Sequence, residues 1–303
     1  MGIPRGSARL LLEEGKRRPF SGALLQLGRS SVYFTSRDLD RWAARHSFVL
    51  RPGIPETPTH DPRLASQGCI DDRTLFARLG FDHVEASDIS QWEGADHIFD
   101  LNLPIPVELE GRFDVVFETG TIVQIFHLPN VLANLHRLLK PGGRVIHCAV
   151  PSNNHMDLGF YMLCPTLFAD FYAANGYRIE THYLCEYFAY WHQGRLHSDP
   201  WRIYEYRPGS LDALSYGRYG GAQAAVFLVA TRTAEATGDV VPQLGQYRRM
   251  WRQHDATVDV TAERGGPPGA RGVGRRAWLA KRVVESIRRR LLPRSMPRLV
   301  ARY

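Results

Sequence analysis

The sequence contains only four cysteines, and no two of them form a C-x-x-C pair. This scarcity excludes a disulfide scaffold, argues against a zinc site and favours a reducing, cytoplasmic setting. No apolar run is long enough to cross a bilayer, and Glu13 and Glu14 interrupt the apolar part of the first twenty residues. We therefore expect neither a transmembrane helix nor a secretory leader.

The motifs of several common enzyme classes are also missing. The chain has no G-x-x-x-x-G-K-[ST], no H-E-x-x-H and no G-x-S-x-G. Phosphate-loop hydrolases, zinc proteases of the H-E-x-x-H type and α/β-hydrolases therefore have no support. What is present is an ordinary globular composition, with 44% hydrophobic and 23% charged residues over 303 positions, enough for a substantial core.

Positive charge is concentrated at one end of the chain. Residues 264–303 hold twelve Lys or Arg and one acid, a net charge of +11. The other 263 residues hold 26 basic and 30 acidic side chains, a net charge of −4. The basic character of the whole chain is thus a property of this tail, and it gives no reason to expect nucleic-acid binding by the main body.

Within the tail, residues 275–292 have the pattern of an amphipathic helix. Apolar residues recur there at a spacing of four, at Leu279, Val283, Ile287 and Leu291, and arginines lie on the opposite side. This pattern predicts a peripheral contact with an anionic membrane surface. A helix docked on its own domain, or a solvated tail, is an equally supported alternative. Nucleic acid is not an expected partner, because no aromatic stacking platform accompanies the arginines.

The chain divides into three predicted regions. Residues 1–19 form an N-terminal extension, residues 20–232 an α/β domain, and residues 233–303 a polar linker with the basic tail. Within the domain, residues 51–67 contain four prolines and little periodicity, which predicts an inserted loop.

The central region alternates strand-like and helix-like segments. The predicted order is a strand at 22–28, a helix at 71–80, strands at 83–88 and 113–118, a helix at 129–139 and a strand from 144. Glycines punctuate the ends of these segments, as in Lys140-Pro141-Gly142-Gly143. Such alternation predicts a parallel sheet.

The same segments carry a family resemblance. The strand Phe113-Asp114-Val115-Val116, a helix and the turn Leu139-Lys140-Pro141-Gly142-Gly143 occur in that order. This series resembles the class I methyltransferases that use S-adenosylmethionine. The resemblance implies a Rossmann-like sheet with helices on both faces, and S-adenosylmethionine as the cofactor.

The resemblance also implies a set of cofactor contacts. Asp88 closes the second predicted strand, where the family places an acid on the ribose hydroxyls, and a carboxylate can accept both hydrogen bonds. Asp100 would accept the adenine amino group, and Leu101 would cover the ring. The other implied contacts are Gly28, Ile89, Glu118, Thr119 and Gly120. For Asp88, a helix-capping or turn role is the alternative, since Ser90 follows it closely.

The glycine-rich loop of the family is represented by a single glycine. Gly28 is followed by Arg29, where the family has further glycines. A bacterial subgroup of methyltransferase-like proteins resembles the chain here, because it too begins with an L-G-R segment. That subgroup usually has Glu-His two residues after Gly-Thr and a His before Gly-Phe-Tyr. This chain has Val123-Gln124 and Leu158 at those positions.

Two further features of the sequence bear on an acceptor. His155 follows the strand that starts at 144, in a loop that faces the substrate in the family, so it is a candidate base for a hydroxyl nucleophile. A hydrogen-bonded loop histidine is the alternative. Residues 160–201 are rich in aromatic side chains, which predicts core packing or, less strongly, a ring-binding pocket.

Two functions follow from these observations. The first is methyl transfer from S-adenosylmethionine to a small-molecule or glycan-type acceptor, in the cytoplasm and at a membrane face. The second is a methyltransferase-like protein without catalysis that acts as a partner or scaffold in a biosynthetic assembly. The sequence does not disclose the acceptor or the oligomeric state.

Overall fold

The computed structural model describes residues 2–192, 195–197, 200–211, 214, 219–245, 247–248 and 296–303, with backbone only at 190–192 and 195–197. The predicted amphipathic helix at 275–292 lies outside these residues, so the membrane contact stays a prediction. Within the described residues, no helix is long and apolar enough to cross a membrane.

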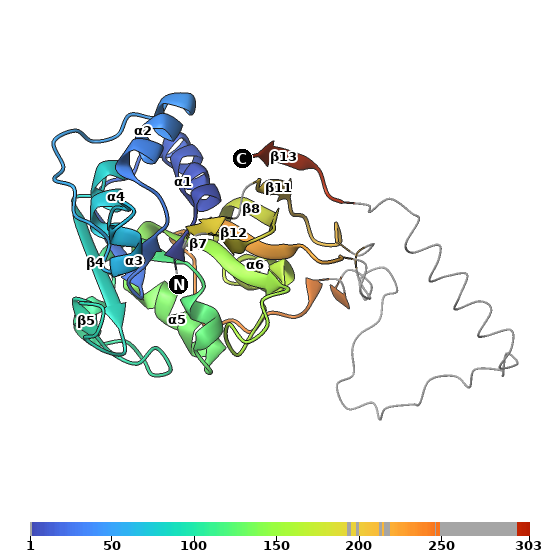
Figure 1. Ribbon diagram of the computed structural model, residues 1–303. Helices are drawn as coiled ribbons and strands as arrows, with labels where there is room; N and C mark the ends of the chain where they lie inside the picture. The colour runs from blue at the N-terminus through green and yellow to red at the C-terminus, as the bar shows by residue number, and fades with distance from the viewer. Residues whose placement is uncertain are drawn as a thin grey trace, which may run out of the picture.

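A nine-stranded mixed sheet forms the centre of the molecule, in the order β13-β11-β8-β12-β7-β6-β2-β4-β5 (Figure 1). Its strands are β2 (Ala23–Leu27), β4 (His83–Asp88), β5 (His97–Ile98), β6 (Phe113–Glu118), β7 (Leu139–Asn153), β8 (Arg178–Tyr187), β11 (Arg202–Glu205), β12 (Gln223–Thr231) and β13 (Leu299–Arg302). The five strands from β7 to β5 are parallel, whereas β12 runs antiparallel to both β7 and β8. Two short pairs lie outside the sheet: β1 (Gly2–Ile3) with β3 (Ser31–Val32), and β9 (Tyr190–His192) with β10 (Arg195–His197).

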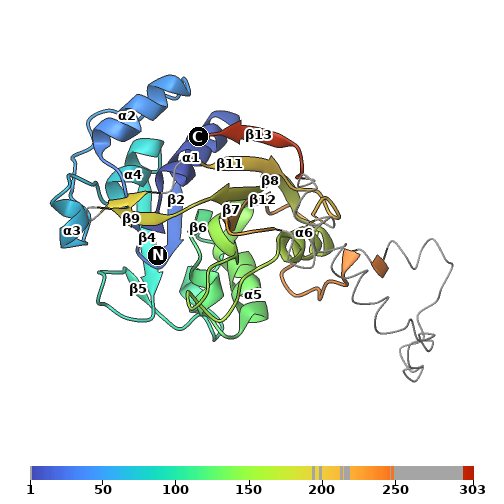
Figure 2. The same ribbon diagram turned by 45° about the vertical axis from the view of Figure 1, so that its right-hand side comes forward.

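Helices cover both faces of this sheet (Figures 1 and 2). They are α1 (Arg5–Arg17), α2 (Ser36–Arg45), α3 (Pro62–Ala65), α4 (Asp72–Leu79), α5 (Leu128–Leu138) and α6 (Pro165–Ala174), with short 3-10 turns η1 (Val107–Leu109) and η2 (Thr121–Gln124). The predicted α/β class, with a parallel core and helices on both faces, is confirmed. The short helix α3 lies within the proline-rich stretch that the sequence predicts to be a loop.

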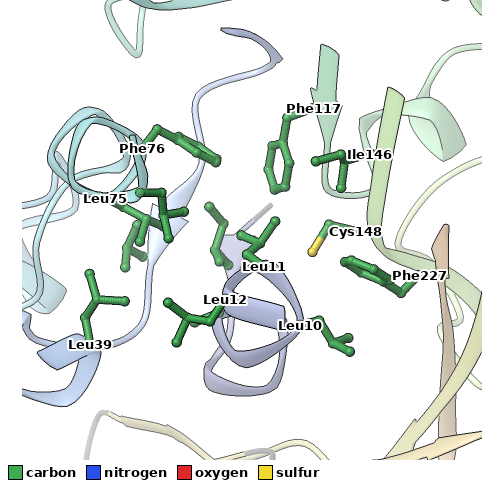
Figure 3. Packing of buried hydrophobic residues seen from close by; sticks show 14 of the residues in the cluster. Leu10, Leu11, Leu12, Leu39, Leu75, Phe76, Phe117, Ile146, Cys148 and Phe227 are labelled. Carbon is green, nitrogen blue, oxygen red and sulfur yellow. The ribbon is translucent and has the colours of Figure 1, made fainter. Parts of the chain in front are cut away.

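The first core cluster packs α1, α2 and α4 against one face of the sheet. Leu11 of α1 lies among side chains from β6, β7 and β12, and Phe76 of α4 contacts Phe117 with ring centroids 4.9 Å apart (Figure 3). Burial of each large apolar side chain contributes roughly 1.5–3 kcal/mol. Helix α1 therefore contributes to the core, although it lies within residues 1–19, which the sequence analysis assigns to an N-terminal extension. The predicted boundary at residue 20 stays a prediction.

The second core cluster packs α5 and α6 against the opposite face. Apolar residues of α5 at helical spacing, among them Val131 and Leu135, meet Val116 and Val145 of the sheet. Six of the aromatic residues predicted to fill the core do so: Phe168, Phe171, Tyr172, Tyr177, Tyr187 and Trp201 are buried. Phe160 and Phe188 are instead exposed.

Local sequence signals explain the two helices beside the site. The Asp71 side chain caps α4 by accepting from the Thr74 N–H at 2.7 Å, and Gly80 ends the helix with φ +127°. Helix α5 begins with a proline in its first turn, where the missing N–H costs nothing. Both helices thus start and end where the sequence predicts, within one residue.

Candidate functional site

The sheet has its topological switch point between β2 and β6. From β2 the chain continues outward through β4 to β5, and it then returns to the other side of β2 with β6. In an open parallel sheet, the loops at such a point diverge and leave a crevice beyond the carboxyl ends of the strands. Gly28, directly after β2, and Thr121, just after β6, lie on the two sides of this point. The Thr121 hydroxyl donates to the Leu27 carbonyl at 2.6 Å.

Gly28 lies at the switch point itself, between Thr121 and Asp88. Its φ is +75°, and a Cβ built on it would lie 3.1 Å from the Thr121 Oγ1 and 3.8 Å from the Asp88 Oδ2. Any side chain would therefore be strained and would project toward these two polar atoms. The structure brings together Gly28, Asp88 and Thr121, although they lie up to 93 positions apart in the sequence.

Asp88 ends β4 beside β2 and is partly buried. Its Oδ1 accepts a hydrogen bond from the Ser90 N–H at 3.1 Å, so the turn role considered from the sequence is present. Its Oδ2 is the atom nearest to Gly28 in this carboxylate. The next residue, Ile89, is 69% exposed. One oxygen of Asp88 thus closes the turn, while the other lies beside Gly28.

The bulky residue after Gly28, Arg29, is held by hydrogen bonds to other segments of the protein. The Arg29 guanidinium forms a two-point ion pair with Asp72 at the start of α4, with N–O distances of 2.5 and 2.7 Å. It also donates to the carbonyls of Glu93 and Gly94 at 3.4 Å. Asp72 is fully buried and Arg29 is largely so, with side chains 0% and 9% exposed. Arg29 therefore joins the end of β2 to the start of α4 and to the segment 93–94.

The segment after β5 is fixed by hydrogen bonds to α5. The Asp100 Oδ1 accepts from both the backbone and the side-chain N–H groups of Asn102 at 2.8 Å. Leu101 is buried, and its carbonyl accepts from Asn130 and Asn134 of α5. Asp100 is thus partly engaged within its own turn, and Leu101 belongs to the second core cluster.

Glu118 ends β6 but turns into the protein interior. Its Oε1 lies 2.7 Å from the His147 Nδ1, and its Oε2 accepts from the Gly120 N–H at 2.8 Å. The His147 Nε2 in turn lies 2.6 Å from the Tyr172 hydroxyl. Glu118 and His147 are fully buried, and burial raises the pKa of Tyr172 well above its usual value. The Glu118 carboxylate is therefore occupied by partners within the protein.

Thr119 and Gly120 follow Glu118 at the same edge of the sheet. Thr119 is buried, and its hydroxyl donates to the Gly2 carbonyl at 3.2 Å. Gly120 has φ +94°, the left-handed conformation that lets the chain turn directly into η2. The segment containing Gly2 pairs with Ser31 three residues beyond Gly28, so the N-terminal strand lies against this edge.

His155 lies beyond the carboxyl end of β7, as its position in the sequence predicts. Its Nε2 is 3.0 Å from the hydroxyl of Tyr187, whose ring stacks on Trp201 at 4.6 Å. Burial lowers the pKa of His155 below its usual value, so the ring is neutral at pH 7. The structure thus shows a neutral His155 ring whose Nε2 meets Tyr187 and whose Nδ1 is buried.

Sequence reasoning missed Thr121, Asp72 and the role of Arg29. Each of them acts through a hydrogen bond to a residue at least 43 positions away in the sequence, Thr121 to Leu27 and Arg29 to Asp72. The Gly120-Thr121 pair was part of the subgroup resemblance, so it offered a signal for Thr121. No signal in the sequence links Arg29 to Asp72.

Two cavities lie elsewhere and include none of the predicted site residues. One, of about 310 Å³, lies between α1 and the strands around β13 and is lined by Glu13, Tyr183 and Tyr303 among others. The other, of about 390 Å³, includes His182 and Tyr206. Among the described residues, no cluster of His, Cys, Asp and Glu is arranged to share a metal ion.

Comparison with known proteins gives structural matches only. No family model and no curated protein matches the chain. Among solved structures, a SAM-dependent methyltransferase of Thermotoga maritima is 14% identical, with 76% of this chain and 90% of that chain covered and a TM-score of 0.34. The 1,6-didemethyltoxoflavin N1-methyltransferase of Burkholderia thailandensis is 15% identical over 76% and 78% of the two chains, with a TM-score of 0.26.

A 16S rRNA (adenine(1408)-N(1))-methyltransferase of Catenulisporales acidiphilia is 12% identical over 76% of this chain and 90% of that chain, with a TM-score of 0.28. All three scores are below 0.5. Function is therefore inferred below from the residues of this chain.

Proposed function

We propose that this protein transfers a methyl group from S-adenosylmethionine to a small-molecule acceptor. The observation that carries the proposal is the juxtaposition of Gly28, Asp88 and Thr121 at the switch point of the sheet. That is the place where open α/β sheets bind ligands. A carboxylate oxygen there faces a glycine that leaves room for a close backbone approach.

The residues present fit the cofactor at its ribose. The Asp88 Oδ2 is the acceptor for the ribose hydroxyls, while Oδ1 keeps the turn with Ser90. The partly buried Asp100 and the buried Leu101 stand next along the same edge, at the end where the adenine belongs. Ile89, exposed beside Asp88, is available to cover an apolar ring face.

The backbone at Gly28 and Gly120 borders the crevice from its two sides, because one follows β2 and the other β6. Glu118 and Thr119 act in this proposal by holding that backbone, since their side chains are engaged internally. When bound, S-adenosylmethionine supplies a methyl group that its sulfonium already activates, so catalysis can depend largely on positioning. His155 is proposed to accept the proton that the acceptor gives up.

A non-catalytic partner or scaffold protein is the second candidate. The observation that favours it is the engagement of Glu118 with His147 and of Thr119 with Gly2, together with a single glycine at the first motif. Fewer groups are then left to hold the methionine part of the cofactor.

Calorimetric titration with S-adenosylmethionine and S-adenosylhomocysteine separates the two candidates. We expect measurable heat and an upward shift of the unfolding temperature with either compound, because a ligand that binds only the native state stabilises it. Absence of both effects at millimolar cofactor would refute the enzyme proposal and leave the scaffold function.

A further inference from the structure

Large apolar side chains are exposed on two loops next to the candidate site. One loop follows β6 and η2, and the other follows β7, so both emerge at the carboxyl edge of the parallel strands. Their exposed members, between 39% and 80% accessible, are named here the apolar rim: Phe126, Met156, Leu158, Phe160 and Met162. Exposed apolar groups gathered in this way mark a binding surface more often than an ordinary solvent face.

The apolar rim is a built arrangement within the two loops. The rings of Phe126 and Phe160 meet edge to face, with centroids 5.7 Å apart and an interplanar angle of 85°. The Tyr161 hydroxyl donates to the Phe126 carbonyl at 2.7 Å, which ties one loop to the other. The Phe160 N–H donates to the Val123 carbonyl at 2.8 Å.

A glycine makes this contact between the loops possible. A Cβ on Gly159 would lie 2.6 Å from the Val123 carbonyl oxygen, so a larger residue would push the second loop away from η2. Because η2 begins at Thr121, the same short turn borders both Gly28 and the apolar rim. The rim therefore adjoins the candidate cofactor crevice.

The near absence of charged residues in the two loops indicates which kind of ligand the apolar rim can bind. Residues 120–128 contain no Asp, Glu, Lys or Arg, and residues 154–164 contain only Asp157. A polyanion such as RNA needs cations for its phosphates, and these loops offer none. The rim side chains are aromatic rings, thioethers and a leucine, which favour an apolar ring over sugar hydroxyls, although exposed polar residues such as Gln124 and Asn154 lie in the same loops.

We propose that the apolar rim binds the acceptor, and that the acceptor is a neutral, apolar small molecule with an aromatic ring. This inference rests on the proposed function for the identity of the acceptor. The existence of an apolar binding surface depends only on the exposed residues of the rim. His155 stands at the margin of the rim, since its backbone N–H lies 3.5 Å from the Met162 sulfur.

Equilibrium dialysis with 2-naphthol tests the inference, with 2-naphthoate, glucose and an RNA oligonucleotide as competitors. We expect 2-naphthol to bind and the other three to leave its binding unchanged. The Phe160→Ser and Phe126→Ser variants should each weaken 2-naphthol binding about tenfold, because each removes one ring contact. Val49→Ser is the matched control, since Val49 is 88% exposed outside the rim.

Several results would overturn the inference. The first is equal affinity of the wild type and both Phe variants for 2-naphthol. The second is effective competition with 2-naphthol by 2-naphthoate, glucose or RNA. The third is adsorption of the wild-type protein to phosphatidylcholine vesicles that Phe160→Ser abolishes. A wild-type dimer that Phe160→Ser converts to a monomer would identify the rim as an interface between copies. Unfolding temperatures equal to that of the wild type show that the variants are folded.

Titration with S-adenosylhomocysteine keeps the two proposals apart. Binding of this compound without binding of 2-naphthol refutes the rim and leaves the proposed function intact. Binding of 2-naphthol at the rim without binding of S-adenosylhomocysteine refutes the proposed function and leaves the apolar binding surface.

Discussion

Replacing Asp88 by asparagine separates the two roles that the structure combines in this side chain. The variant keeps an oxygen that can accept from the Ser90 N–H, so the turn after β4 is preserved. It replaces the oxygen that faces Gly28 by an NH₂ group, which cannot accept a hydrogen bond. Affinity for the cofactor and stability of the fold should therefore respond differently to the same change.

The expected loss of affinity follows from the hydrogen bonds that are removed. Each hydrogen bond to a charged group contributes about 1.5–3 kcal/mol, so the loss of even one ribose bond should make S-adenosylhomocysteine bind about 10- to 150-fold more weakly. The free energy of unfolding should change by only about 0.5 kcal/mol, because the turn bond remains. Asp88→Ala should lose the same affinity and, in addition, about 1 kcal/mol of stability.

Calorimetry for affinity and urea unfolding for stability measure both quantities on the same preparations. Glu108→Gln serves as the control, because it removes an exposed carboxylate from η1, before β6 rather than after it. If Asp88→Asn binds S-adenosylhomocysteine as tightly as the wild type does, Asp88 does not hold the ribose and the proposed geometry is wrong.

Three further changes test other parts of the structure. Gly28→Ala should lower the free energy of unfolding by about 1–2 kcal/mol, because the φ of this residue is positive. It should also weaken cofactor binding, because the new methyl would lie 3.1 Å from the Thr121 Oγ1. Unchanged binding in calorimetry would contradict a close approach of the cofactor at this residue. His147→Leu should destabilise the fold by about 1–3 kcal/mol in urea unfolding, because it leaves the Oε1 of the buried Glu118 without its hydrogen-bond partner, and an unchanged free energy of unfolding would argue against a structural role for this hydrogen bond. Burial lowers the pKa of His182 to about 3 in the native state. In the unfolded chain a histidine has its ordinary pKa of about 6.5, so below that pH the unfolded chain binds a proton that the native state does not bind. Stability should therefore fall between pH 7 and pH 5, with about 2 kcal/mol of that loss absent in His182→Gln, and equal losses in both proteins would refute this assignment.

The sequence alone determined the local elements of the parallel core. The Phe113–Glu118 strand, the apolar spacing of α5 and the helix that Gly80 ends depend on neighbouring residues, and the structure has them where the patterns predict. Asp88 at the end of β4 was predictable for the same reason, because a strand boundary is set by the residues beside it.

Tertiary structure decided which way the side chains at those strand ends point and what they meet. Glu118 and Asp88 occupy the same kind of position, yet Glu118 turns inward to His147 whereas the Asp88 Oδ2 faces Gly28. The pairing of Arg29 with Asp72 likewise required α4 to be placed against the end of β2. Hydrophobic periodicity shows which side chains of one segment share a face. These contacts instead join segments 29 to 60 residues apart, so periodicity carries no information about them. Pairing of β6 with β7 and of β2 with β4 sets the first two contacts, and the packing of α4 on the sheet sets the third.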